Sequence, residues 1–433
     1  MLTNEQNERL TRVGPGTPMG NMLRRYWHPV AALSQMNQRD TLPVKLLGED
    51  LVLYRDLSGN LGLLQARCPH RSMSLVYGMP TDCGLRCSYH GWAFDAKGAC
   101  TEQPYEEAED PSGRFKKKVR IKAYPVAQHG GMVLAYLGPE PVPQLPPWDL
   151  FVMDGVMREI GYAVVPCNWL QIMENSLDPV HVEWLHRHMF NYVVRKLGQP
   201  ERQCVPSAHQ KIGFDAFEHG IVKRRVLEDT DEDNEVWAVG HPVLFPNILK
   251  SGSAANPVFQ IRVPIDDVTT AYWWYRCFTP ASKVQIKPEA PEDIPYYTVP
   301  IPQLDASGLP QWDVLDNNSG QDIVAWITQG TITDRSQEML GRSDKGIVLY
   351  RRQLEQAIQA VEEGRDPPLN VFRDAGVNRI DLPVEQNKLG KSRDINDVMN
   401  KNARTGNTSK YSPVLRELDS AVEVATSSRR SLS

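Results

Sequence analysis

The sequence predicts an α+β protein in which a small all-β module precedes a larger domain built on an antiparallel sheet. Short β-like runs such as "VKLLGEDLVLYR" and "GMVLAYLG" alternate with Gly, Pro and Asn turns in the first third of the chain. The Pro-rich stretch "GPEPVPQLPPW" then marks a linker. We expect an N-terminal helical segment at 1–26 that packs on the second domain, an all-β module at 27–145, and the second domain at 146–433.

The second domain mixes strand-like and helical segments. Four of its segments are rich in β-branched and aromatic residues, which is typical of strands: "EIGYAVVPCNW", "HGIVKRRVL", "FQIRVPI" and "TTAYWWYRCF". In "KGIVLYRRQLEQAIQAVEEG" the apolar residues recur at helical spacing, so this segment is predicted to be a long amphipathic helix.

Composition narrows the class of protein. The 433 residues carry a formal net charge of -5 and are 41% hydrophobic, which favours neither nucleic acid nor an anionic membrane as a partner. No run of eighteen apolar residues and no signal peptide is found, so a cytoplasmic protein without a membrane span is expected. The seven cysteines are an odd number, and a close Cys/His set in a reducing compartment indicates metal binding more than disulfides.

Two Cys-and-His pairs frame a loop-like stretch in "CPHRSMSLVYGMPTDCGLRCSYHGW". Cys68 and His70 form the first pair, and Cys87 and His90 form the second. Zinc fingers group Cys with Cys and His with His, whereas here each half contributes one of each. This alternation suits a Rieske-type 2Fe-2S cluster, in which two cysteines bind one iron and two histidines the other. Zinc is the less favoured alternative.

A second candidate metal site lies in "CNWLQIMENSLDPVHVEWLHRHMF". Asn175, Asp178 and His181 recur at i, i+3 and i+6, which places them on one side of a helical stretch. His186 is five residues beyond His181, about 140° away on an ideal helix, so both can face one ion only if the backbone departs from a straight helix. Pro179 is a candidate cause of that departure.

Two histidines need an anionic third ligand to form the two-His, one-carboxylate set of non-haem ferrous iron. The segment "GQDIVAWITQGTITDRSQEMLGRSD" offers three candidates, Asp322, Asp334 and Asp344. Asp322 begins an apolar helical segment and is expected to point inward, whereas the other two lie among polar residues. Asp322 is therefore the predicted ligand.

The Rieske motif followed by "EN..D..H....H" resembles the catalytic α subunit of ring-hydroxylating Rieske non-haem iron oxygenases. The stretches "GPGTPMGNMLRRYWHPV" and "SGQDIVAWITQGTITDRSQEMLGRSDKGIV" are similar to the phthalate dioxygenase group, which includes oxygenases for phthalate, chlorobenzoate and phenoxybenzoate. The resemblance covers essentially the entire chain. It implies a Rieske domain followed by a helix-grip-like catalytic domain, one 2Fe-2S cluster and one mononuclear Fe(II) per subunit, and a homotrimer or dimer of trimers.

The resemblance also implies roles for two residues near the iron. Asp178 matches a bridging carboxylate that hydrogen-bonds a cluster histidine of a neighbouring subunit, by position His90, and the iron ligand His181 on its own side. Asn175 matches a residue close to the iron. The alternative for Asp178 is a helix cap before Pro179.

The activity implied is cis-dihydroxylation of an aromatic carboxylate with dioxygen. No G-x-G-x-x-G follows a strand and no plant-type Cys spacing is present, so a separate flavin reductase that oxidises NAD(P)H is the expected partner. The resemblance to the phthalate dioxygenase group implies that this reductase also carries an iron-sulfur cluster. Two alternatives remain open: a Rieske monooxygenase or O-demethylase of an aromatic acid, and an electron-transfer Rieske protein without oxygenase activity.

An aromatic carboxylate needs a cation in the substrate pocket. Lys250 follows an apolar run near His241 and is the favoured anchor, with His241 and Arg225 as further candidates. In a strand Arg224 faces away from Lys223 and Arg225, so the triplet cannot enter one pocket together. One lysine suits a monocarboxylate, which favours benzoate or chlorobenzoate over phthalate.

Overall fold

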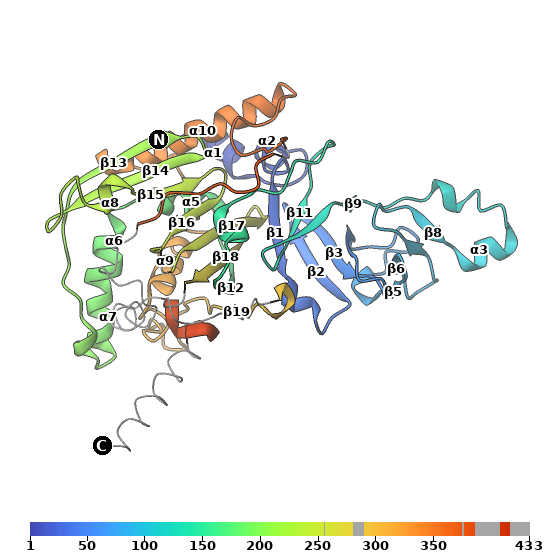
Figure 1. The fold of residues 1–433 in the computed structure, drawn as a ribbon, viewed down its shortest axis with the longest axis horizontal. Helices are drawn as coiled ribbons and strands as arrows, with labels where there is room; N and C mark the ends of the chain where they lie inside the picture. Colours follow the sequence, from blue (N-terminus) through green and yellow to red (C-terminus); the bar gives the residue numbers. More distant parts are fainter. Residues whose placement is uncertain (255, 280–289, 375, 386–407, 416–433) are drawn as a thin grey trace, which may run out of the picture.

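The computed structural model describes residues 1–254, 256–279, 290–374, 376–385 and 408–415. A narrow β-rich end projects from a larger body of sheet and helices (Figure 1). The β-rich end contains two four-stranded sheets, ordered β2-β3-β4-β9 and β5-β6-β7-β8, and a three-stranded sheet, β1-β11-β10, lies beside them. The strands are β1 (Trp27–Ala32), β2 (Thr41–Leu46), β3 (Glu49–Arg55), β4 (Leu61–Gln65), β5 (Met79–Thr81), β6 (Gly84–Arg86), β7 (Ala93–Phe94), β8 (Cys100–Glu102), β9 (Ala123–Tyr124), β10 (Val126–His129) and β11 (Met132–Tyr136).

The larger body is built on one eight-stranded sheet, in the order β13-β14-β15-β16-β17-β18-β12-β19. Seven neighbouring pairs make up this sheet, and all are antiparallel except β12 with β19, which run parallel. The predicted antiparallel sheet is thus confirmed apart from one short edge strand. The strands are β12 (Met157–Val165), β13 (His209–Phe217), β14 (Gly220–Leu227), β15 (His241–Leu244), β16 (Ile248–Ser251), β17 (Val258–Asp266), β18 (Thr269–Phe278) and β19 (Tyr296–Thr298).

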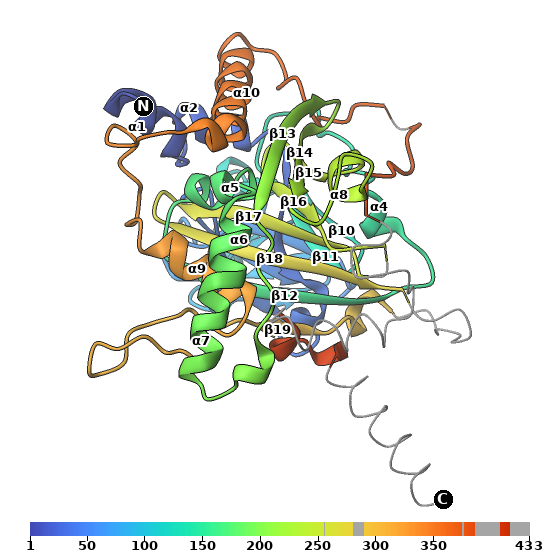
Figure 2. The ribbon, with the colours of Figure 1, turned by 90° about the vertical axis from the view of Figure 1, so that its left-hand side faces the viewer.

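Helices cover one face of this sheet. Figure 2 shows α5, α6, α7 and α9 lying across the face that is nearest the viewer. The α-helices of the described residues are α1 (Asn4–Thr11), α2 (Pro18–Leu23), α3 (Pro104–Glu109), α4 (Asp149–Val152), α5 (Trp169–Ser176), α6 (His181–Glu183), α7 (Phe190–Lys196), α8 (Glu235–Ala238), α9 (Asn318–Ile327) and α10 (Lys345–Glu362). A π-helical segment, η4 (Trp184–Met189), joins α6 to α7. The space between helices and sheet is where the predicted iron ligands lie.

The predicted amphipathic helix is confirmed as α10, which buries Tyr350, Leu354 and Ile358 at helical spacing. The first residues of the chain form α1 and α2, and these helices pack against α5 and α10. Thr3 caps α1 by accepting a hydrogen bond from the N–H of Gln6, while the Gln6 side chain accepts from the N–H of Thr3, so both orphan donors are satisfied.

A buried charge network ties α5 to the rest of the body. Glu174 on α5 lies 2.7 Å from Arg335 and 2.6 Å from Arg351, and Arg335 also donates to Asn7 of α1. Burial would raise the pKa of Glu174, but the two guanidinium groups lower it below its ordinary value. The network therefore holds α1, α5 and α10 together at the start of the segment that leads to the iron ligands.

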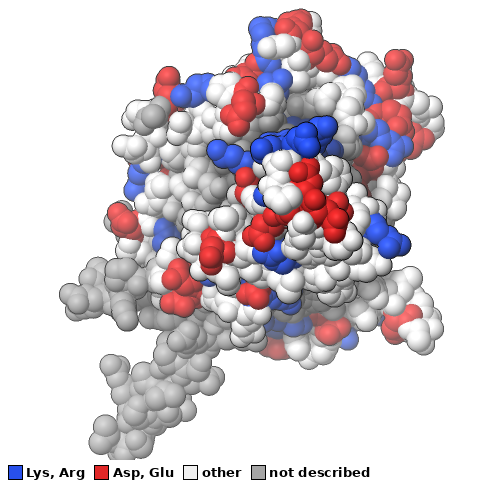
Figure 3. Space-filling model, turned by 90° about the vertical axis from the view of Figure 1, so that its right-hand side faces the viewer, with Lys and Arg blue, Asp and Glu red and all other residues white. Residues whose placement is uncertain are grey.

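Charges of both signs cover the projecting β-rich end. Figure 3 faces this end and shows Lys and Arg side chains gathered in a band beside a group of Asp and Glu. The turn at Lys116–Lys118 and the helix α3, which carries Glu106 and Glu107, belong to this part of the chain. Basic and acidic side chains thus lie next to each other on this part of the surface (Figure 3).

Among the residues described, no helix has both the length and the apolar character that crossing a membrane requires.

Replacing Arg335 by Met is expected to destabilise the protein by about 3–5 kcal/mol, because Glu174 would remain buried with one of its two partners gone. The denaturation midpoint, followed by circular dichroism, measures the effect. Arg342→Met is the matched control, since Arg342 is exposed. A midpoint for Arg335→Met equal to that of the control would contradict a stabilising role for the network.

Candidate active site

Two loops in the β-rich end have the same backbone pattern around Cys68 and Cys87. In each loop the cysteine N–H donates to the carbonyl five residues on, at 2.9 and 2.8 Å, and the cysteine carbonyl accepts from the N–H four residues on, at 2.9 and 3.0 Å. That fourth residue has a positive φ, 57° at Ser72 and 76° at Gly91. Such backbone is usually left to glycine, so Ser72 is held in its conformation by the loop around it.

The loops bring together the four predicted cluster ligands. The thiols of Cys68 and Cys87 interact with each other and are buried, whereas His70 and His90 are exposed with ring centres 4.4 Å apart. The His70 ring also stacks on Trp92 at 4.5 Å. Two sulfur donors at the buried end and two imidazoles at the exposed end form the donor set that a Rieske cluster requires.

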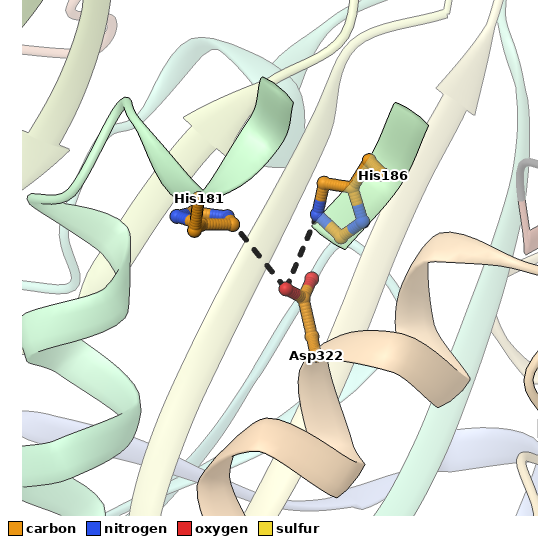
Figure 4. Close-up of side chains that lie close together, drawn as sticks. All are labelled: His181, His186 and Asp322. Atoms are coloured by element: carbon orange, nitrogen blue, oxygen red, sulfur yellow. Dashed lines mark ion pairs between the residues drawn. The ribbon is translucent and has the colours of Figure 1, made fainter. Parts of the chain in front are cut away.

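A second group of candidate ligands lies in the larger body (Figure 4). His181 comes from α6, His186 from η4 and Asp322 from α9, and their ligand atoms all lie within 4.8 Å of one another. Asp322 Oδ1 is 3.2 Å from His186 Nε2 and 3.7 Å from His181 Nε2. This oxygen is buried and has no hydrogen-bond partner within the part of the chain that the structure describes, which fits a position that faces a bound cation. Asp334, the rejected alternative, is exposed.

The helix that carries the two histidines departs from regular geometry, as predicted, but for another reason. The departure is the π-helical segment at Trp184–Met189 rather than a kink at Pro179. In a π-helix the hydrogen bonds join residues five apart, so His181 and His186 lie on the same side of the helix. The predicted continuous helical stretch from Asn175 to His181 is wrong, because α5 ends at Ser176 and α6 begins at His181.

Gln321 fixes the orientation of the His186 ring. Its amide nitrogen donates to the carbonyl of Leu315 at 2.9 Å, so its oxygen faces His186 Nδ1, also at 2.9 Å, and accepts from it. His186 Nε2 is therefore left unprotonated toward Asp322. Burial would raise the pKa of Asp322, but the two histidines and Arg262 lower it, so this carboxylate is anionic at neutral pH.

Asp178 has two sets of contacts. Its Oδ1 accepts from the N–H groups of Val180 and His181, at 2.8 and 3.3 Å, so it does cap the turn before α6. Its Oδ2 lies 3.6 Å from His181 Nδ1. Burial would raise the pKa of Asp178, whereas His181 and these backbone donors lower it below its ordinary value.

A cavity of about 250 Å³ opens beside the three ligands. Asn175, His241 and Arg225, all predicted site residues, line it together with His181, His186 and Asp322. His241 also contacts Glu385 at 2.8 Å. The lining of the cavity includes four basic residues, Arg187, Lys223, Arg225 and Arg276.

The strand β14 separates its basic residues as predicted. Lys223 and Arg225 line the cavity, whereas Arg224 lies on the other face, where it pairs with Asp215 at 2.6 Å. Arg225 Nε is buried without a hydrogen-bond partner among the described residues. Burial lowers the pKa of Arg225 and the Glu385 charge opposes this, but a guanidinium remains charged at neutral pH.

Lys250 does not reach the cavity, so the prediction of Lys250 as the carboxylate anchor is wrong. Its ammonium is buried in an ion pair with Asp149 at 2.5 Å and donates to the Leu382 carbonyl at 2.9 Å. A charge buried this deeply needs a partner of its own, and Lys250 already has one. Its role is therefore structural.

Sequence reasoning missed Gln260, which lines the cavity from β17. Its Oε1 accepts from Tyr272 Oη at 2.5 Å and from Arg262 Nη2 at 2.9 Å, so its amide N–H groups are turned toward other acceptors, among them Ser251 Oγ at 3.3 Å. The signal was a neutral polar residue in the strand "FQIRVPI", where Arg262 is the only other polar residue.

Comparisons with known proteins agree with this site. The family model described as "Rieske [2Fe-2S] domain" matches residues 26–125. A second family model, described as "LigXa C-terminal domain like", matches residues 311–409. The 5,5'-dehydrodivanillate O-demethylase oxygenase subunit of Sphingobium sp. strain SYK-6 is 48% identical over 386 residues, which cover 89% of this chain and 87% of the relative. Phthalate 4,5-dioxygenase oxygenase subunit of Pseudomonas putida is 31% identical, over 84% of this chain and 88% of the relative. The terminal oxygenase of carbazole 1,9a-dioxygenase from Novosphingobium sp. KA1 has a similar fold, with a TM-score of 0.56 at 20% identity over 81% of this chain and 97% of that structure.

The fold and the donor sets define an oxygenase with a Rieske cluster and a non-haem iron. The chain belongs to the Rieske non-haem iron oxygenases, as the oxygenase (α) subunit of the phthalate dioxygenase group. It is thus one component of a multicomponent enzyme, with one Rieske 2Fe-2S cluster and one mononuclear iron as its cofactors. This family membership excludes the alternative of an electron-transfer protein without oxygenase activity.

Replacing Gln321 by Leu is expected to weaken iron binding by about 10–100-fold, because the His186 ring would lose the acceptor that sets its tautomer and angle. Competition between the protein and a chelator for Fe(II) measures the affinity. Gln329→Leu is the control, since Gln329 is exposed. Unchanged affinity in Gln321→Leu would contradict an orienting role for this amide.

Proposed function

We propose that the protein is the oxygenase component of an O-demethylase that acts on a methoxylated aromatic acid. The likeness to 5,5'-dehydrodivanillate O-demethylase, at 48% identity over most of both chains, is the observation that carries this choice. Phthalate 4,5-dioxygenase is 31% identical, so ring cis-dihydroxylation, the reaction first expected from the sequence, becomes the second candidate. Electrons come from a separate reductase that oxidises NAD(P)H.

Seven side chains are assigned as ligands in this proposal. Cys68, His70, Cys87 and His90 hold the cluster, and His181, His186 and Asp322 hold the iron. When bound, the cluster supplies electrons and the iron, with positions left open by three protein ligands, supplies dioxygen activation. The buried Oδ1 of Asp322, which lies close to both histidines and has no hydrogen-bond partner among the described residues, supports the assignment of the iron site.

The proposed reaction consumes one dioxygen, two electrons and two protons for each methyl group. One oxygen atom enters a C–H bond of the methoxy group and the other leaves as water. The hydroxymethyl ether so formed is a hemiacetal, which breaks at its C–O bond to give a phenol and formaldehyde. Ring dihydroxylation would instead put both oxygen atoms into one product, so the products distinguish the two candidates.

Recognition of the acid is assigned to the basic wall of the cavity. Arg225 presents a buried guanidinium whose Nε has no partner among the described residues, and Arg187 and Lys223 line the same cavity. A guanidinium can hold a carboxylate through two parallel hydrogen bonds, which also sets the angle of the ring. This arrangement directs the substrate by its carboxylate and leaves the methoxy group to face the iron ligands.

Subunit assembly is part of the proposal. We retain the homotrimer or dimer of trimers, in which the exposed His90 of one subunit meets Asp178 of the next. The exposure of His90 and the position of Asp178 beside His181 support that arrangement. Asp178 would then join the electron donor and the iron ligand through one carboxylate.

The first experiment is turnover of the reconstituted enzyme with vanillate and with phthalate. Formaldehyde and a catechol in equal amounts from vanillate are expected. A cis-diol containing two atoms from one labelled dioxygen would establish the second candidate instead, and dihydroxylation of phthalate without demethylation of vanillate would contradict the proposal.

Replacing Arg225 by Met is expected to lower kcat/KM for the aromatic acid by about 10–100-fold, because a charge-assisted hydrogen bond of about 1.5–3 kcal/mol is lost. The methyl ester of the same acid should be affected much less. Arg224→Met is the matched control, since Arg224 lies on the opposite face of the same strand. Equal losses for acid and ester would show that Arg225 does not bind the carboxylate.

Replacing Asp178 by Asn is expected to keep both metal centres but to reduce coupled turnover by about 10–100-fold. Asn caps helices as well as Asp does, so the turn before α6 should be preserved. Iron and sulfide content and formaldehyde formed per NAD(P)H consumed are the measurements. Turnover equal to that of the wild type would remove the bridging role and leave Asp178 as a cap.

A further inference from the structure

A second cavity of about 570 Å³ adjoins the one that contains the iron ligands. Three residues, Val182, Arg187 and Arg225, line both cavities, so the two meet at these side chains. We call the cavity beside the iron ligands the inner cavity and the other one the outer cavity. The proposed carboxylate anchor, Arg225, therefore stands at their junction.

The volumes indicate a substrate longer than one ring. Pockets that enclose drug-sized ligands measure roughly 300–1,000 Å³, and the inner cavity, at about 250 Å³, falls below that range. It has room for one substituted aromatic ring at the iron ligands. The outer cavity, at about 570 Å³, has room for a second ring, and it begins where the first ring's carboxylate would be held.

The outer cavity contains a buried acceptor for which the described residues supply no donor. His209 has a side chain that is 6% exposed, and both its N–H and its Nδ1 contact Glu183 Oε2, at 2.8 and 2.9 Å. Because Glu183 is an acceptor, Nδ1 carries the ring proton and Nε2 is bare. His209 Nε2 is buried without a hydrogen-bond partner among the described residues. A ligand hydroxyl is the group that would satisfy it.

The charges of the outer cavity distinguish a hydroxyl from a second carboxylate. Its described lining includes five acidic residues, whereas its arginines are the two at the junction. The acidic residues are Glu183, Asp229, Asp233, Glu235 and Glu385. A second carboxylate placed among them would be repelled, but a phenol that donates a hydrogen bond would not.

We propose that the outer cavity is the binding site for the second ring of a two-ring aromatic acid, with a hydroxyl on that ring donating to His209 Nε2. The methoxylated ring occupies the inner cavity, and its carboxylate lies at Arg225 and Arg187. This inference rests on the proposed function, because it extends the substrate of the same site.

The test uses the loaded enzyme and three acids: vanillate, 5-(hydroxyphenyl)vanillate, and 5-phenylvanillate, which lacks the second-ring hydroxyl. The wild type should have a kcat/KM at least about tenfold higher for the hydroxylated two-ring acid than for either of the others, since a site built around a buried acceptor rejects analogues that lack the donor. Preference for vanillate would overturn the proposal.

Two variants separate the outer cavity from the rest of the site. Ser207→Trp places an indole in the outer cavity, and it should lower kcat/KM for both two-ring acids by about tenfold while vanillate changes by less than about twofold. His209→Phe should remove the preference for the hydroxylated acid over 5-phenylvanillate. Gln210→Trp, three residues further along the chain and exposed, is the control for Ser207→Trp.

Binding measurements keep this inference separate from the proposed function. Calorimetric titration of the resting enzyme should give tighter binding of the hydroxylated two-ring acid than of vanillate, and Ser207→Trp should abolish the difference. If binding follows this pattern but no formaldehyde forms, the proposed reaction is wrong and the outer-cavity site stands. If vanillate is demethylated but Ser207→Trp affects all three acids alike, the outer-cavity site is wrong.

Discussion

In the larger body, two imidazoles and one carboxylate face a single point inside the protein. The helices around that point are arranged to meet this constraint. Polar groups buried this deeply are stable only when a partner satisfies them, so the surrounding backbone must position them accurately. The π-helical segment η4 brings His181 and His186 to one side, and α9 supplies Asp322 from a distant part of the chain. Gln321, one residue before Asp322, sets the ring of His186. One short helix thus provides both a candidate ligand and the support for another candidate ligand.

The buried charges of the chain fall into two groups with different consequences. Glu174, with its two arginines, and Lys250, with Asp149, are fully paired and hold elements together. Asp322 Oδ1 and Arg225 Nε are buried without a hydrogen-bond partner among the described residues, and both lie on the inner cavity. Leaving such groups unsatisfied costs free energy, which is expected where a ligand completes them. The distinction separates structural charges from those available for chemistry.

The two ends of the molecule present their candidate metal ligands differently. In the β-rich end the cysteines are buried and the histidines are exposed, so the cluster's imidazole edge faces outward. In the larger body the three candidate ligands lie beneath α6 and α9, next to a polar cavity. An outward-facing edge suits electron transfer between protein surfaces, whereas an enclosed site excludes water from a reactive centre. The different burial of the two sets of side chains therefore suits one set to electron transfer and the other to the reaction.

The sequence by itself determined the elements whose signals are local. The Cys-and-His pairs, the choice of Asp322 over Asp334, the helix α10 and the opposite facing of Arg224 and Arg225 all follow from spacing and periodicity, because one or two turns of backbone set them. The same motifs also indicate the family. That resemblance identifies the protein as a Rieske oxygenase but does not identify its reaction or substrate.

Only the tertiary structure decided which distant groups meet. The sequence favours Lys250 over Arg225 as the anchor, but the Lys250 ammonium is paired with Asp149, 101 positions away. The π turn, the amide of Gln260 and the outer cavity with His209 depend on packing between strands and helices that no local pattern records. Ion pairing and cavity shape are set by contacts far apart in the chain, and for that reason the substrate site could not be predicted from the sequence as the metal ligands were.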